Sequence, residues 1–455
     1  MAKKVTYLLF AALSMGMLVC GFVSNTWQAA PSWLFRNFNA DCECMVVGRL
    51  VKSHQDGCLS AGALMGAGYR AEGDDPLSNE GVALQYKAYT KGFALKHYWV
   101  YRSEPGFQAT TLSVLDRILR VPPAEKLRLF RAGTGVLSAA ALTLLFVWIS
   151  IEWGVAAGLF ALGGAVLSHW TTCFGRNLYW QLWAYYVPVL ASGYLLLIRH
   201  RTGRPGWPAI AVAVGGAMLV KCLFTGFGYV TTVAIMSLTP LVYYAALERW
   251  RLRVLLGRGV LLCSAVGAAI LVGLGVVLFQ IARAGDSWGA ALSYVVDSFG
   301  RRARGDPLKY GALYQASLEA STISVLTTYA NGILFQPAWR TGPAVAVRVW
   351  HLCAVFLLAS LVALLLARQK DAPAARTSRL QALTLATWFS LLAPLSWLII
   401  FKAHSQIHTH VNHITWFMPF VFLGLALSGC VVVDIATLAR KRMARCWRRS
   451  TSDST

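Results

Sequence analysis

Two carboxylates stand shortly after the first hydrophobic segment, where they could do chemistry at a membrane surface. Asp41 and Glu43 lie in the stretch 38–44. A carboxylate at the outer edge of a helical bundle can act as a general base on a hydroxyl group. Residues two apart share one side of an extended strand, whereas on a helix only one of them would face the site. We take both as candidate catalytic residues and Asp41 as the stronger.

The same residues also have a structural interpretation. Asn39 or Asp41 could cap a helix predicted over 44–51. Asn and Asp suit that position because their side chains accept hydrogen bonds from the free backbone N–H groups of the first turn. The residues alone leave the catalytic and the capping interpretations open.

Three basic residues lie where each could meet a phosphate group. Arg176 lies beside aromatic residues, Lys221 is flanked by apolar residues, and Lys402 follows a hydrophobic segment. Arginine and lysine hold phosphate through charge-assisted hydrogen bonds. Each could instead extend its charge out to the membrane surface from an apolar stem. A lysine so close to an apolar run is costly, which makes Lys221 a functional candidate.

Four of the nine histidines fall between 404 and 413. His404 and His408 would share a helical face, where they could donate hydrogen bonds to phosphate oxygens or bind a metal ion. A polar turn without any ligand is the third interpretation. No carboxylate stands nearby in the sequence, so we assign no metal ligand and no certain cofactor, with a divalent metal left as an alternative.

The elements that must position these residues are membrane helices. The 455 residues are 57% hydrophobic and 13% charged, with a mean hydropathy of +0.54, whereas soluble domains have about 25% charged residues. Backbone polar groups inside a membrane must be satisfied within the segment, so an all-α polytopic bundle is expected. The net charge of +23 is spread over many short loops rather than one basic domain, which excludes a nucleic-acid partner.

Ten segments approach the roughly 20 apolar residues that cross a membrane. We treat 1–455 as a single membrane domain. A cleaved signal peptide is the alternative for the first segment, but its apolar run is long and no small-residue cleavage site follows. The predicted spans are Val5–Val23, Gly135–Ile151, Gly154–Trp170, Gln181–Ile198, Ala209–Leu223, Tyr229–Leu247, Val260–Ile281, Trp350–Leu366, Leu380–Ile400 and Ile414–Leu438.

Lysine and arginine gather in alternate loops, which predicts the orientation. The basic loops lie at 199–204, 249–258 and 368–379, with a basic tail at 439–455. Such loops face the cytoplasm, so both termini are expected there.

Two long loops, 24–134 and 282–348, then face outward. In the first, apolar residues recur at helical spacing over 112–120, which fits a helix in the membrane interface or one packed on the bundle. A disulfide from Cys42 or Cys44 to Cys58 could form in an oxidising compartment.

This layout resembles the GT-C superfamily of polytopic glycosyltransferases, which includes the protein O-mannosyltransferases and the bacterial lipid A aminoarabinose transferases. Members share a cytoplasmic N-terminus, a long outer loop with an acidic residue or pair near its start, interface helices and about ten spans. The resemblance covers nearly the whole chain. It implies that Asp41 or Glu43 matches the catalytic carboxylate and that a polyprenyl-phosphate sugar is the donor, usually with inversion. The chain departs from many relatives because the short loop around Arg176 has no acidic residue.

The expected function is therefore a membrane glycosyltransferase in a bacterial inner membrane, with its active site on the periplasmic face. It would move a sugar to a cell-envelope glycan or lipid acceptor. The predicted phosphate-binding residues are Arg176, Lys221, Lys402, His404 and His408. An O-antigen polymerase or ligase is the first alternative, although here the larger loop comes first. A transporter is the second, although it would more often show repeats and polar residues at the membrane midplane.

Overall fold

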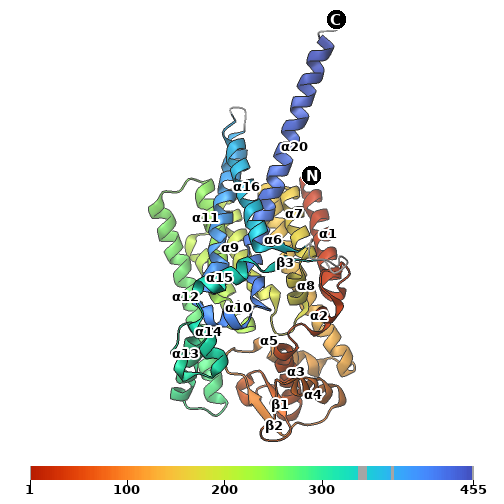
Figure 1. Cartoon of the computed structure of the whole chain (residues 1–455), viewed down its shortest axis with the longest axis vertical. Helices are drawn as coiled ribbons and strands as arrows, with labels where there is room; N and C mark the ends of the chain where they lie inside the picture. The colour runs from red at the N-terminus through yellow and green to blue at the C-terminus, as the bar shows by residue number, and fades with distance from the viewer. Residues whose placement is uncertain (1, 337–345, 370–372, 453–455) are drawn as a thin grey trace.

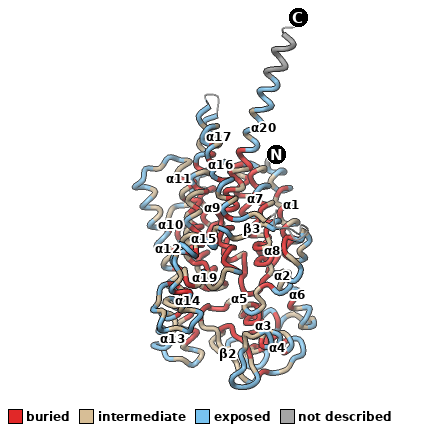
Figure 2. Tube along the Cα trace, viewed as in Figure 1, coloured by how far each residue is buried: buried red, intermediate tan, exposed pale blue. Residues whose placement is uncertain are grey.

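Long helices standing side by side form most of the molecule. The computed structural model describes residues 2–336, 346–369 and 373–452. Figure 1 shows shorter helices and two small strands gathered beyond one end of the bundle, while α20 (Phe420–Ser452) extends past the other end. Buried residues run through the bundle and continue into the gathered elements (Figure 2). The two regions therefore share a continuous core.

Nine helices in the described residues are long and apolar enough to cross a membrane, and a bent pair can make a tenth. This confirms the predicted all-α polytopic bundle of about ten spans. The other spanning helices are α1 (Ala2–Ser24), α6 (Pro123–Trp153), α9 (Leu182–Thr202), α10 (Trp207–Thr225), α11 (Val230–Leu247), α12 (Leu252–Arg283), α16 (Val349–Ala367), and α17 (Ala374–Ser390) continued by α18 (Leu392–Ile400).

Several predicted spans have different bounds in the structure, and three of these differences have a clear local cause. The segment 154–170 is not one straight helix, because α7 (Val155–Leu167) and α8 (His169–Arg176) meet at 73° where Ser168 adopts an extended backbone. α6 begins at Pro123, about a dozen residues before its predicted start. Proline suits the first turn of a helix because backbone N–H groups have no helical acceptor there, so the N–H that proline lacks is not needed. α20 begins after Pro419 rather than at 414, since proline cannot continue a preceding helix.

The first outer region connects α1 to α6 and is built around α3. Its elements are α2 (Ser32–Asn37), α3 (Ala40–Asp56), η1 (Ser60–Ala63), β1 (Gly66–Tyr69), α4 (Asn79–Lys91), β2 (His97–Val100) and α5 (Phe107–Ile118). β1 and β2 pair antiparallel, with Gly66 opposite Val100. α5 packs on α3 through its buried Leu112 and Asp116, while Leu115 and Ile118 stay exposed.

The predicted cap of α3 is not formed. The helix begins at Ala40, earlier than expected, and Asn39 has a left-handed backbone (φ 47°) with no capping hydrogen bond from its side chain. Asp41 falls inside the first turn. The disulfide that the sequence left open is not formed in the structure: Cys42, Cys44 and Cys58 are free thiols.

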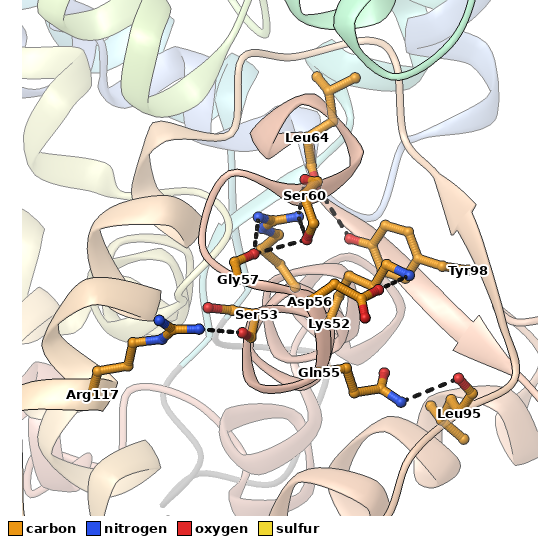
Figure 3. Close-up of polar contacts among 11 residues, drawn as sticks. Lys52, Ser53, Gln55, Asp56, Gly57, Ser60, Leu64, Leu95, Tyr98 and Arg117 are labelled. Atoms are coloured by element: carbon orange, nitrogen blue, oxygen red, sulfur yellow. Dashed lines mark hydrogen bonds and ion pairs between the residues drawn. The ribbon is translucent and has the colours of Figure 1, made fainter.

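A fully buried arginine within α3 binds the backbone that follows the end of this helix. Arg49 donates to the backbone carbonyls of Ser60 (2.6 Å), Gly57 (3.3 Å) and Cys58. The surrounding contacts are drawn in Figure 3, among them the Lys52–Asp56 ion pair (2.5 Å) and the bond from Arg117 to the carbonyl of Ser53 (2.5 Å). Buried carbonyls need such partners. The region thus has its own polar scaffold, which fixes the end of α3 and the turn that follows it.

The second outer region connects α12 to α16. It contains α13 (Trp288–Arg302), η2 (Pro307–Lys309), α14 (Ala312–Glu319), α15 (Thr322–Ala330), β3 (Ile333–Phe335) and β4 (Val347–Arg348). α13 and α14 pack on α19 (Lys402–Ile407), which carries His404. His408 and His410 follow in the turn after α19, and His413 lies in η4 (Asn412–Phe417). The predicted site residues of both outer regions therefore lie at one end of the bundle.

Candidate functional site

A cavity of about 420 Å³ lies where the outer regions meet the ends of the spanning helices. We call it the central cavity. One wall is hydrocarbon and comes from α12, through Ile270, Leu274 and Val277, together with Phe299 of α13. Polar groups come from the loop after β2, from the α8–α9 connection and from the end of α13. These polar lining residues are Tyr101, Arg102, Ser103, Glu104, Tyr179, Ser298, Arg302 and His404.

Glu104 is the only carboxylate among the residues that line the central cavity. Its side chain is buried (6% exposed). Oε1 accepts a hydrogen bond from the Tyr179 hydroxyl at 3.0 Å, whereas Oε2 has no partner in the described part of the chain. Burial raises the pKa of Glu104 from 4.5 to about 7, although the Tyr179 hydrogen bond and the charge of Arg302 act to lower it. A carboxyl group with such a pKa can exchange a proton near neutral pH.

The backbone opposite Glu104 is shaped for close approach. Gly226 has a positive φ (57°), and a Cβ there would lie 2.3 Å from Cγ of Glu104. Lys221 holds this turn, because its ammonium group donates to the carbonyls of Gly226 (2.7 Å) and Gly228 (2.6 Å). The turn between α10 and α11 therefore packs closely against the side chain of Glu104.

Two arginines line the central cavity: Arg102 is paired with Asp286 at 3.0 Å, whereas Arg302 has no carboxylate within ion-pair distance in the described residues. Arg302 ends α13, is half-buried, and donates from Nη1 to the Ser298 hydroxyl at 2.9 Å. Its charge lowers the pKa of Glu104 and, after burial, contributes to lowering the pKa values of His404 and His408. A guanidinium beside a hydrocarbon wall is suited to a phosphate group that carries an apolar chain.

Asp41 lies next to this cavity without lining it. Its side chain is exposed in the first turn of α3. Burial raises the pKa of the Cys42 thiol, and the carboxylates of Asp41 and Glu104 both raise it further, so the two acids lie near one thiol. Asp41 also opposes the lowering of the His408 pKa. The structure thus brings Asp41, Glu104 and His408 into one neighbourhood.

Glu43 lies elsewhere and is fully engaged. Oε1 accepts from Nε of Arg131 (2.9 Å), from Nη2 of Arg131 and from the Tyr86 hydroxyl (3.0 Å), while Oε2 accepts from the backbone N–H of Leu178 (3.2 Å). Arg176 lines the same small recess, where its guanidinium stacks on Phe35 at 4.4 Å. These contacts favour a structural role for Glu43, which ties α3 to α6. Because α3 is a helix, Asp41 and Glu43 do not share a face.

Lys402 is also tied to backbone carbonyls. Its ammonium group donates to Leu318 (2.7 Å) and Ala320 (2.6 Å), at the end of α14. A helix C-terminus offers unsatisfied carbonyls that a lysine can bind. Like Lys221, Lys402 therefore stabilises backbone near the cavity instead of extending into it.

The histidines divide between two places. His404 lines the central cavity, its Nδ1 is buried without a partner in the described residues, and its ring lies 4.4 Å from that of His408. Burial lowers the pKa of His404 well below its usual range and that of His408 to about 4, so both rings are neutral at pH 7. His413 instead stacks on Trp170 at 5.1 Å. Across the described residues, no group of three or more His, Cys, Asp or Glu side chains is arranged to hold a metal ion.

The sequence analysis singled out neither Glu104 nor Arg302 as a site residue. A signal was present for the first: Glu104 follows a stretch rich in tyrosine and directly precedes Pro105 and Gly106. An acidic residue in such an aromatic stretch is unusual enough to single out.

The chain was also compared with known proteins. No protein-family model, no curated protein and no solved structure matches it significantly. The geometry described above therefore carries the functional argument.

Proposed function

We propose that this protein is a membrane glycosyltransferase that uses a polyprenyl-phosphate sugar as donor. One observation carries the proposal: the central cavity joins a carboxylate, Glu104, a guanidinium, Arg302, and a hydrocarbon wall from α12. A lipid-linked sugar phosphate has three matching parts, namely an apolar chain, an anionic phosphate and a polar sugar.

The sugar donor would enter beside α12. Ile270, Leu274 and Val277 would contact its hydrocarbon chain, and burying those apolar surfaces favours binding. Arg302 would bind the phosphate through charge-assisted hydrogen bonds. Tyr179 and His404 offer further polar contacts to the head of the lipid.

Glu104 would act as the general base of the transfer. The hydroxyl oxygen of the acceptor attacks the anomeric carbon, the bond from that carbon to the phosphate oxygen breaks, and the Glu104 carboxylate takes the hydroxyl proton. The leaving group is the polyprenyl phosphate, which gains one negative charge that Arg302 stabilises. Attack from the face opposite the phosphate inverts the anomeric carbon.

Asp41 would serve the acceptor. Its exposed carboxylate can accept hydrogen bonds from sugar hydroxyls as a glycan or lipid acceptor approaches. The active site would then face the periplasm of a bacterial inner membrane, with both termini in the cytoplasm, as the distribution of arginine and lysine predicts. His408, close to Asp41, would border the acceptor rather than the phosphate.

The test is sugar transfer in membranes that contain the protein, using a panel of polyprenyl-phosphate sugars. Wild type is compared with Glu104→Gln, Asp41→Asn and Glu43→Gln, with insertion and folding checked for each. The proposal expects transfer that Glu104→Gln abolishes. Transfer from no monophosphate donor, but elongation of a polyprenyl-pyrophosphate glycan, would instead identify a polymerase or ligase. Uptake of a solute without any transfer would identify a transporter.

A further inference from the structure

A second polar cavity of about 420 Å³ lies at the opposite end of the bundle. It is lined where α9 ends and α12 begins, and we call it the arginine pocket after Arg199 and Arg258. Val230 at the start of α11 lines the central cavity, whereas Glu248, just after its end, lines the arginine pocket. At 1.5 Å per residue, α11 separates the two by about 27 Å. Figure 1 shows α12 beginning at the end of the bundle from which α1 starts and α20 leaves.

Arg258 is held in the pocket by aromatic rings alone. Its guanidinium lies 3.9 Å from the ring centre of Trp250 and 4.4 Å from that of Trp207. Within the described residues it has no hydrogen bond and no ion pair. Stacking fixes the plane of a guanidinium and leaves its five N–H groups free for an oxyanion.

A chain of contacts keeps the ring of Trp250 in place. Glu248 accepts from the Trp250 indole N–H at 2.7 Å through one oxygen and contacts Nδ1 of His200 at 2.6 Å through the other. Both carboxylate oxygens are therefore engaged and neither bonds to Arg258, although the Glu248 charge lies near enough to act on the guanidinium. Arg199 adds a second guanidinium to the lining, 5.0 Å from Trp207, and its Nη1 donates to the carbonyls of Pro205 (2.6 Å) and Gly203 (3.4 Å). Those bonds use one nitrogen and hold the guanidinium at the pocket.

The surroundings favour an anion as well. Further arginines stand on or beside the two connections that frame the pocket, namely Arg201, Arg204, Arg249 and Arg251. Basic pockets between spanning helices, at the end where such residues gather, are suited to the phosphate of a lipid headgroup. A carboxylate has two oxygens and could bond to only some of the N–H groups of Arg258 and Arg199. A phosphate has more oxygens and could accept hydrogen bonds from both guanidinium groups.

We propose that the arginine pocket binds a phosphate group, carried either by an anionic lipid headgroup or by a soluble phosphate. Arg258 is its principal ligand and Arg199 the second. This site is independent of the central cavity and of the sugar-transfer proposal, because it lies at the other end of the same helices.

The experiment uses the full chain, purified and delipidated in detergent. Native mass spectrometry counts bound phosphatidylglycerol, with diacylglycerol as the lipid that lacks phosphate, and tryptophan fluorescence follows inorganic phosphate in a second arm. Wild type is compared with Arg258→Gln and with Arg253→Gln, an exposed arginine on the same helix that does not line the pocket. We expect Arg258→Gln to weaken binding about tenfold or more, and Arg253→Gln to behave as wild type.

The two arms identify the carrier of the phosphate. Retention of phosphatidylglycerol that depends on Arg258 supports a lipid headgroup, and binding of inorganic phosphate alone supports a soluble phosphate. If Arg258→Gln does not fold, Arg258→Lys keeps the charge but loses the planar stack, and it should bind several-fold more weakly. Equal binding by wild type and the Arg258 variants in both arms would overturn the proposal, as would an equal loss in Arg253→Gln.

Discussion

Replacing Glu104 by glutamine should stabilise the folded protein at high pH while removing its activity. The carboxyl group keeps its proton in the fold up to about pH 7 because burial raises its pKa, whereas in the unfolded chain it ionises near pH 4.5. Below pH 4.5 the carboxyl group is protonated in both the folded and the unfolded state, so its ionisation does not change the free energy of unfolding. As the pH rises from 4.5 to 7, the unfolded state loses its proton first, so the free energy of unfolding falls. Glutamine has the same shape and cannot ionise.

The magnitude follows from the two pKa values. They differ by about 2.5, and each pKa unit corresponds to about 1.4 kcal/mol, so the ionised Glu104 destabilises the fold by about 3 kcal/mol above pH 7. The side chain is 6% exposed, so solvent screening reduces this only slightly. The difference in unfolding free energy between Glu104→Gln and wild type should therefore grow by about 3 kcal/mol between pH 4 and pH 8.

The assay is reversible unfolding in mixed micelles, followed by tryptophan fluorescence across that pH range. A difference in unfolding free energy between Glu104→Gln and wild type that is the same at every pH would reflect altered hydrogen bonding to Tyr179. Only the part of the difference that changes with pH tests the raised pKa. The exposed Glu72 offers a matched control, and Glu72→Gln should show no such growth. A difference that stays flat with pH for Glu104→Gln would refute the assignment of a raised pKa.

Three further predictions concern the same contacts. Sugar transfer should fall as the pH drops below about 7, since Glu104 then takes up the proton that a base must lack, and a pH–rate profile measures this. Arg302→Gln should weaken binding of polyprenyl phosphate about tenfold or more in a competition assay, whereas the exposed neighbour variant Arg304→Gln should not, and equal effects would argue against a phosphate contact. Arg131→Met should lower stability by about 3–5 kcal/mol in denaturant unfolding because it leaves Glu43 buried without its partner, and an unchanged midpoint would contradict that pairing.

The helical bundle could be predicted from the sequence because hydropathy and length are local properties. Backbone groups inside a membrane force helices, and their flanking arginines mark the ends. The break at Ser168 was missed because 154–167 is an unbroken apolar run that only Ser168 and His169 end, whereas the structure turns α8 inward and buries Thr171 and Thr172. The early start of α6 was hidden as well, because its first turns are rich in charge.

The site was harder to predict because its groups are defined by distant partners. Glu104 gains its raised pKa from burial beside the backbone of Gly226, which lies far along the chain. Lys221 and Lys402 are natural phosphate ligands by residue type, yet both ammonium groups bind backbone carbonyls that sequence alone cannot place. Their roles as phosphate ligands remain predictions, as do those of Asp41 and Glu43 in catalysis.

The most direct test of the central claim is sugar transfer by the purified protein with Glu104→Gln and Asp41→Asn side by side. The proposed roles predict that Glu104→Gln loses transfer at every pH while still binding the sugar donor, and that Asp41→Asn keeps measurable transfer with a raised KM for the acceptor. Full activity in Glu104→Gln, with transfer lost only in Asp41→Asn, would contradict the account and make Asp41 the base.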